Sequence, residues 1–222
     1  MHTFLTGTRF ILLWVLGTIF ALLGAAVVAG LLALGGMLLG GLITGRSGGD
    51  PNPTTLFIVL VILLSLLGSS FGLLFGAVQK ALLRQMTGDP WRGWLVTSLL
   101  GGVTGVLLTF FLIVYQVELL LTLTPLEIVQ AVGLQLFVVP FACLGLAQWP
   151  VVAQEVRNSW LWALANIVAG VVMYGLIVGG LFAGAASLLI GLGLLLLLAA
   201  APGIVTGFTM LSLLLFQRRS TW

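Results

Sequence analysis

Residues 160–216 read WLWALANIVAGVVMYGLIVGGLFAGAASLLIGLGLLLLLAAAPGIVTGFTMLSLLLF, and this stretch decides the fold. It contains no aspartate, glutamate, lysine or arginine. A helix needs roughly 20 apolar residues to cross the hydrocarbon core of a bilayer, which is about 30 Å thick. The stretch is long enough for two crossings, and we place the division at the Gly-Ala-Ala-Ser segment, residues 184–187. It predicts two transmembrane helices, over residues 160–183 and 187–216.

The rest of the chain has the same apolar character. Its 222 residues are 61% hydrophobic and 6% charged, whereas a soluble domain carries about 25% charged residues. A soluble globular protein and a disordered chain are therefore both excluded. Further apolar stretches of spanning length occupy residues 10–44, 55–78, 93–115 and 128–149. We expect an all-α protein: a single polytopic transmembrane domain over residues 1–222, with six spans.

Two of these spans are irregular. As one straight helix, residues 10–44 would be about 52 Å long at 1.5 Å per residue. Such a helix could tilt, project beyond the bilayer or break at Gly35-Gly36, and a break would move the N-terminus to the other side. In the last span, Pro202 removes one backbone hydrogen bond and predicts a kink.

The basic residues separate by side. In the six-span arrangement, seven of the eight lie on the side that holds both termini: Arg9, Lys80, Arg84, Arg92, Arg157, Arg218 and Arg219. Only Arg46 lies on the other side, and the acidic residues show no such separation. This is the positive-inside pattern, so we attribute the net charge of +3 to membrane orientation and not to nucleic-acid binding. It predicts cytoplasmic termini in a bacterial inner membrane, or stromal-side termini in a thylakoid.

The tryptophans lie near the same side. Tryptophan rings prefer the headgroup zone of a bilayer, so we expect interface anchors at Trp14, Trp94, Trp149, Trp160 and Trp162. A docking surface for a partner on that face is the alternative.

The spans suggest three parallel helix-hairpin repeats. Each hairpin opens with a tryptophan, at Trp14, Trp94 and Trp160. Each closes with a related segment, at residues 72–79, 141–148 and 203–210. The first two segments share Gly-x-x-Gln, as Gly76/Gln79 and Gly145/Gln148, whereas the third has Gly207 and Met210.

Gly-x-x-x-Gly-x-x-Gln at the end of an even helix, followed by a basic loop and a tryptophan-led odd helix, resembles a group of multi-pass proteins common in cyanobacteria and related bacteria. The resemblance covers most of the chain. The resemblance implies a bacterial membrane, and a photosynthetic membrane if the chain belongs with the cyanobacterial members of the group. The group has no established activity, so the resemblance implies no catalytic residues.

Small-x-x-x-small spacings are abundant among the 30 glycines. Helices in lipid associate by close packing, which glycine permits. We expect helix packing at Gly68, Gly72, Gly76, Gly101, Gly105, Gly175, Gly179, Gly203 and Gly207. These faces would serve the chain's own helices or another subunit.

Few polar side chains lie within the spans. Gln79 and Gln148 fall near the basic side, where hydrogen bonding or capping is expected. Gln135 and Asn166 lie deeper and need partners, because an unsatisfied amide in hydrocarbon costs several kcal/mol. Interhelical bonds are the default interpretation for these amides. The alternative is a polar contact to a pigment such as chlorophyll, whose magnesium accepts amide oxygens.

Signatures of catalysis are missing from the sequence. The sole histidine, His2, cannot form a metal cluster or a Ser-His-Asp triad. No unambiguous charge lies at mid-membrane, which argues against ion-coupled transport. We therefore expect a non-enzymatic accessory or scaffold subunit of a larger membrane complex, without a metal and with chlorophyll, carotenoid or lipid as the conceivable ligands. The alternative is a channel or facilitator for a small neutral or lipidic substrate.

Overall fold

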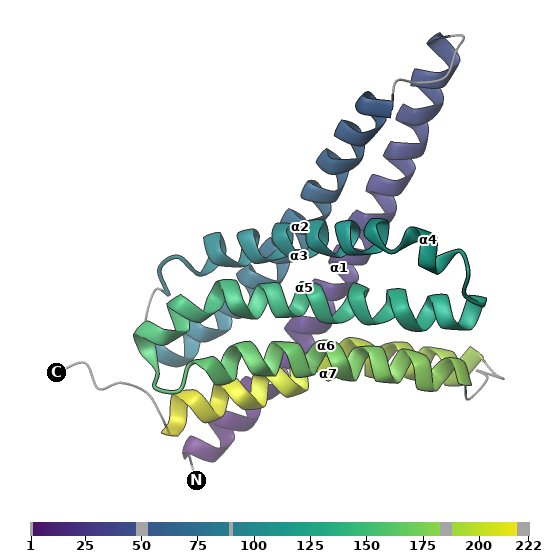
Figure 1. Cartoon of the computed structure of the whole chain (residues 1–222). Coiled ribbons are helices and arrows are strands. Elements are labelled where there is room, and N and C mark those ends of the chain that lie inside the picture. Colours follow the sequence, from purple (N-terminus) through teal and green to yellow (C-terminus); the bar gives the residue numbers. More distant parts are fainter. Residues whose placement is uncertain (1, 48–52, 89–90, 183–187, 217–222) are drawn as a thin grey trace.

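The protein is a bundle of helices, as expected. The computed structural model describes residues 2–47, 53–88, 91–182 and 188–216. All regular structure in these residues is helical: α1 (His2–Ser47), α2 (Pro53–Thr87), α3 (Trp94–Tyr115), α4 (Val117–Leu120), α5 (Pro125–Glu155), α6 (Trp160–Phe182) and α7 (Leu188–Phe216) (Figure 1). Six of them are long and apolar enough to cross a membrane. The prediction of an all-α, multi-pass membrane protein is confirmed.

The helix bounds resolve one irregular span. Helix α1 runs without interruption through Gly35 and Gly36, so the first span is one helix, about 69 Å long. Pro202 lies within α7, which continues on both sides of it. The predicted division at residues 184–187 falls outside the described residues.

The six long helices form a closed ring. Each packs against two neighbours, in the order α1, α2, α3, α5, α6, α7 and back to α1. Successive helices run in opposite directions, so α1 begins and α7 ends at the same end of the bundle, which we call end A (Figure 1). The short α4 lies at the opposite end, end B. Among the described basic residues, Arg9, Lys80, Arg84, Arg92 and Arg157 belong to helix ends or loops at end A.

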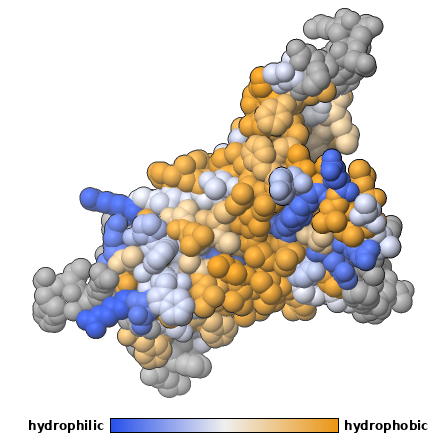
Figure 2. All heavy atoms as spheres, viewed as in Figure 1, coloured by the Kyte–Doolittle hydropathy of each residue, from blue (hydrophilic) through white to orange (hydrophobic). Residues whose placement is uncertain are grey.

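The surface follows this polarity. Hydrophilic residues gather toward the two ends of the bundle, with hydrophobic residues between them (Figure 2). Aromatic and aliphatic side chains exposed there include Phe20 at 70% and Phe111 at 48%. Because lipid tails surround this zone, such exposure is what a membrane-embedded bundle requires.

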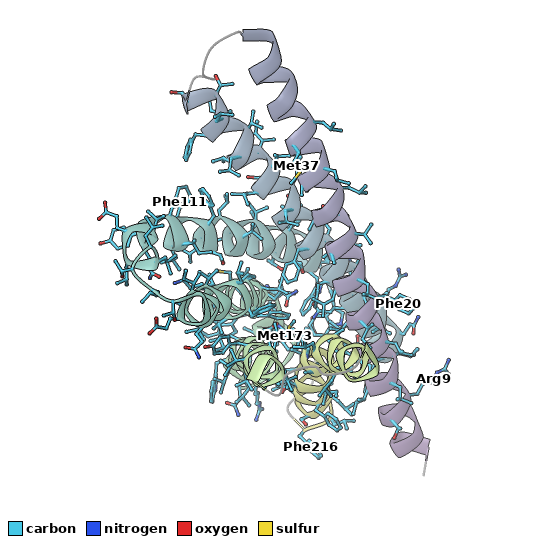
Figure 3. The ribbon with its side chains drawn as sticks, turned by 90° about the vertical axis from the view of Figure 1, so that its right-hand side faces the viewer. Arg9, Phe20, Met37, Phe111, Met173 and Phe216 are labelled. Carbon is cyan, nitrogen blue, oxygen red and sulfur yellow. The ribbon has the colours of Figure 1, made fainter. Side chains whose placement is uncertain are left out.

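Helices α1 and α2 extend beyond the others. Helix α3 has 22 residues, about 33 Å, which matches the hydrocarbon thickness. The second half of α1 and the first third of α2, residues 26–47 and 53–63, lean away from the remaining helices (Figures 1 and 3). We call this segment the arm. The ring is therefore tight near end A and open toward end B.

Glycine sets the tight half of the ring. A Cβ added at Gly68 or Gly101 would lie 2.6 to 2.8 Å from backbone atoms of the neighbouring helix. Backbone cannot yield, so only glycine fits at these crossings. The same holds for Gly72, Gly105 and Gly203, while Gly76 and Gly207 meet the side chains of Ser98 and Trp14. These predicted glycines therefore lie at contacts within the chain.

Gly175 and Gly179 differ. Both are exposed on α6, and no atom of the described residues lies within 4 Å of a Cβ added at either position. The prediction of helix packing is not met there in the described part of the chain.

Candidate functional site

Three tryptophans from alternate helices meet inside end A. Trp14 of α1, Trp94 of α3 and Trp162 of α6 are each 0% exposed. The ring centroids of Trp162 lie 6.1 Å from those of Trp14 and 5.9 Å from those of Trp94. Rings packed in this way contact protein and cannot reach lipid headgroups, so the prediction of interface anchors is wrong for these three. Trp149 and Trp160 are 42% and 52% exposed, as an anchor requires.

The tryptophans belong to a larger apolar core at end A, which we call the tryptophan cluster: Phe10, Trp14, Leu83, Trp91, Trp94, Val151, Val152, Val156, Trp162, Met210, Leu213 and Leu214. Next along the bundle lies a second core, the phenylalanine cluster. Its buried members are Ala21, Phe75, Phe141, Leu144, Ala169 and Met173, with Phe71 packed against them.

Gln148 is the centre of a buried hydrogen-bond network at the tryptophan cluster. Its Nε2 donates to Gln79 Oε1 at 3.0 Å and to Ser98 Oγ at 2.7 Å. Its Oε1 accepts from Trp162 Nε1 at 3.0 Å. One carboxamide thus connects α2, α3, α5 and α6. Because the oxygens of Gln79 and Gln148 accept bonds inside the bundle, neither is directed to a pigment.

Each contact between successive hairpins contains the same elements. A glycine of one hairpin faces a small polar residue four positions after the tryptophan of the next. The pairs are Gly76 with Ser98, Gly145 with Asn166, and Gly203 with Thr18. The sequence signal is Trp-x-x-x-[Thr/Ser/Asn], at 14/18, 94/98 and 162/166, and of these small polar residues only Asn166 is among the predicted site residues.

These contacts change how the closing segment of the third hairpin, residues 203–210, aligns with the other two closing segments. Gly203, and not Gly207, occupies the position of Gly76 and Gly145. The residue three positions later is then Thr206, whose Oγ1 accepts from Trp14 Nε1 at 3.0 Å, as Gln148 accepts from Trp162. Likewise Trp162, and not Trp160, corresponds to Trp14 and Trp94. Descent of the three hairpins from one repeat stays a prediction.

Two polar atoms of this region have no partner among the described residues. They are Trp94 Nε1 and Asn166 Oδ1. Asn166 Nδ2 donates to the carbonyl of Trp162 at 2.9 Å. Its Cβ lies 2.7 Å from a Cβ added at Gly145, so α5 and α6 are in close contact there. A pigment macrocycle cannot approach Asn166 through this contact.

Beyond the phenylalanine cluster, toward end B, the ring opens into a cleft of about 330 Å³. Side chains from α1, α2, α3, α5 and α6 form its walls, including Ala25, Leu67, Val106, Phe137 and Met173. Thr109 is the one polar side chain among the residues that line it. Figure 3 shows Met173 on α6 and the divergence of the arm from α5 and α6.

A second apolar groove lies next to the cleft. It has a volume of about 450 Å³ and lies between α1 and α2 along the arm. Leu64 and Leu67 of α2 line both spaces. The two apolar spaces therefore share part of their lining.

Gln135 lies apart from the end-A network. Its Nε2 donates to Gln116 Oε1 at 2.6 Å, where α3 ends. Of the polar residues predicted for the site, Gln79, Gln148 and Asn166 thus lie at the tryptophan cluster, whereas Gln135 lies near end B. Groups of three or more His, Cys, Asp or Glu side chains that could hold a metal are not found among the described residues.

Comparisons of this chain with protein-family models, with curated proteins and with solved structures found no match.

Proposed function

We propose that the protein is a non-enzymatic membrane protein that binds an apolar, lipid-like molecule in the cleft. The observation that carries this proposal is the cleft itself: about 330 Å³, lined by side chains from five helices that are all apolar except Thr109. Ligand sites are typically concave and mostly apolar, with few polar groups. A volume of this kind in a membrane protein suits an alkyl or isoprenoid chain. Because such a chain leaves a bilayer that is itself apolar, its binding depends on close packing against the cleft walls.

The filled interior at end A favours binding of a ligand over transport of a solute through the bundle. The fully buried Trp14, Trp94 and Trp162 fill the interior there, and Gln148 satisfies its neighbours instead of lining a pore. A facilitator for polar solutes would need a polar path to the midplane. Gln135 and Asn166 occupy separate contacts, so they supply no such path.

The accessory role is part of the proposal. Most of the predicted packing glycines are used within the chain, so a partner subunit would meet other surfaces. The arm and the exposed Gly175 and Gly179 on α6 are the faces left for it. The basic residues at end A support cytoplasmic termini in a bacterial inner membrane or a thylakoid.

The test is recovery of the ligand from the full chain. The protein is purified from native membranes in mild detergent, and its bound apolar molecules are extracted and analysed by mass spectrometry. We expect a discrete apolar species in roughly stoichiometric amount. Copies carrying Ala25→Phe, which fills the cleft, should lose it, whereas Ala26→Phe on the exposed face of the same turn should keep it.

A random sample of membrane lipid, unchanged by Ala25→Phe, would contradict the proposal. The same preparation, run on a native gel, tests the accessory role through co-migrating membrane proteins. Migration as a lone species would count against that role alone.

A further inference from the structure

The cleft contains a polar spot in an otherwise apolar wall. Leu136 and Pro140, four residues apart on α5, both line the cleft. In a regular helix the N–H of residue 140 would donate to the carbonyl of residue 136, but proline has no N–H. The carbonyl of Leu136 therefore lacks its helical donor, in a turn of α5 whose two end residues both line the cleft.

Thr109 lies on the adjacent wall of the same spot, on α3, which packs directly against α5. Its hydroxyl donates within α3 to the carbonyl of Gly105 at 2.8 Å, and its oxygen lies 3.4 Å from the carbonyl of Gln135. Its single proton is thus engaged, and its Oγ is left as an acceptor. The close crossing of Gly105 and Pro140 brings the two walls together, because a Cβ added at Gly105 would lie 2.7 Å from the Pro140 Cα.

The polar spot offers hydrogen-bond acceptors but no donor. It offers two acceptors, the Leu136 carbonyl and Thr109 Oγ, and the side chains that line the cleft carry no free donor and no charge. Inside a membrane such a carbonyl is satisfied by a neighbouring Ser or Thr side chain, a local change in helix geometry, a water or another donor. Thr109 gives its proton to the carbonyl of Gly105, so the Leu136 carbonyl is left to a donor from the ligand. The spot therefore selects a molecule that brings one.

The distance of the polar spot from the end of α3 further limits the class of ligand. Thr109 lies about 9 Å inside the end of α3, counted at 1.5 Å per residue. A phospholipid headgroup resides at the interface and does not reach this depth, and an anionic group would find no cation among the lining residues. A neutral hydroxyl on an apolar body satisfies both conditions.

Building on the proposed function, we infer that the ligand is a neutral hydroxylated lipid, an alcohol or phenol, whose O–H donates to the Leu136 carbonyl beside Thr109.

The test uses two probes that differ only in the donor. One is hexadecanol with a mid-chain diazirine, and the other is its O-methyl ether. Each is photolysed with the full chain in detergent, and labelled peptides are mapped by mass spectrometry. Since one hydrogen bond separates the probes, we expect the alcohol to label the cleft peptides of α3 and α5 about threefold to tenfold more than the ether.

Matched variants locate the acceptor. Pro140→Ala restores the N–H to the Leu136 carbonyl and should reduce the preference to about one, and Thr109→Val should lower it. Pro150→Ala and Thr104→Val, at exposed positions of the same two helices, should leave it unchanged. Each variant is first shown to be folded by gel filtration and circular dichroism.

Equal labelling by both probes in the natural chain would overturn the inference, as would a full preference for the alcohol in Pro140→Ala. If neither probe labels the cleft peptides, it is the proposed function that fails.

Discussion

The two halves of the bundle use the same six helices in different ways. Near end A, glycines let the backbones touch, and Gln148 and two of the three tryptophans pair their polar atoms across helices. Toward end B, the arm leans away from the other helices beside an apolar cleft, while α3 still crosses α2 closely at Gly68 and α5 at Gly105. The phenylalanine cluster lies between the two halves, where Phe71 and Phe75 of α2 each meet Phe141 of α5 edge to face at 5.8 Å.

The difference shows what glycine and bulky side chains each contribute. Where Gly72 and Gly76 face α3, the helices are fixed by direct contact. On the same turns of α2, Phe71 and Phe75 pack in the interior, where their rings contact Phe141 of α5. Close packing stabilises one half of the ring, and the other half retains a space that a ligand can fill.

The largest expected effect comes from Gly72→Leu. A Cβ there meets the backbone carbonyl of Ser98 and lies 3.0 Å from the Cα of Leu99, and neither atom can move aside. We expect a loss of about 3 kcal/mol or more in the free energy of unfolding, or failure to fold. Denaturation by SDS in mixed micelles measures it. Gly35→Leu is the control, because no described atom lies within 4 Å of that site. Equal stability of the two variants would refute the contrast between the halves.

A smaller loss is expected for Gln148→Leu. The change leaves the N–H of Trp162 and the oxygens of Gln79 and Ser98 without this partner. Buried groups left unpaired cost about 1–3 kcal/mol each, though intramembrane bonds average nearer 0.6. We expect roughly 2–4 kcal/mol in the same assay. The exposed Gln154→Leu on the same helix should cost little, and a similar small loss for Gln148→Leu would show that packing alone holds end A.

The three tryptophans sharpen the comparison within end A. All are fully buried, but Trp14 and Trp162 have hydrogen-bond partners, whereas Trp94 Nε1 has none among the described residues. Phenylalanine at position 14 or 162 should therefore cost about 1 kcal/mol more than at position 94. Thermal unfolding of the three variants side by side decides this. A cost at Trp94 equal to the others would reveal a partner, such as a buried water.

The smallest effect concerns pH at end B. The backbone N–H and the hydroxyl of Thr124 donate to the carboxylate of Glu127 at 2.8 and 2.7 Å, the backbone bond being the larger cause of a pKa below its usual 4.5. Glu127 therefore stabilises the first turn of α5 above about pH 4.5, and this stabilisation disappears as the pH falls through the lowered pKa.

Amide exchange in that turn should accelerate as the pH falls from about 4.5 through the lowered pKa, beyond its intrinsic pH dependence. Glu127→Gln should abolish the extra change, and the amides of the tryptophan cluster should show none. A natural chain that behaves like Glu127→Gln would contradict the assignment of the cap.

Much of the fold could be predicted from the sequence. Helix α3 ends at Tyr115, α6 begins at Trp160 and α7 ends at Phe216, each as expected from runs of apolar residues. The candidate site was less accessible. Gln79 and Gln148 were identified as candidates, but their bond to each other was not foreseen, and neither were the roles of Ser98 and Thr206.

The physical reason lies in the solvent. Membrane crossing depends on the summed hydropathy of a contiguous segment, which the sequence states directly. The sequence alone therefore determined the membrane spans and the end of the bundle that carries most of the basic residues. The sequence says little about which face of a helix contacts protein and which contacts lipid, because a lipid tail is as apolar as leucine. The burial of Trp14, Trp94 and Trp162, the register at Gly203 and the cleft at Pro140 were decided only when the six helices closed into a ring.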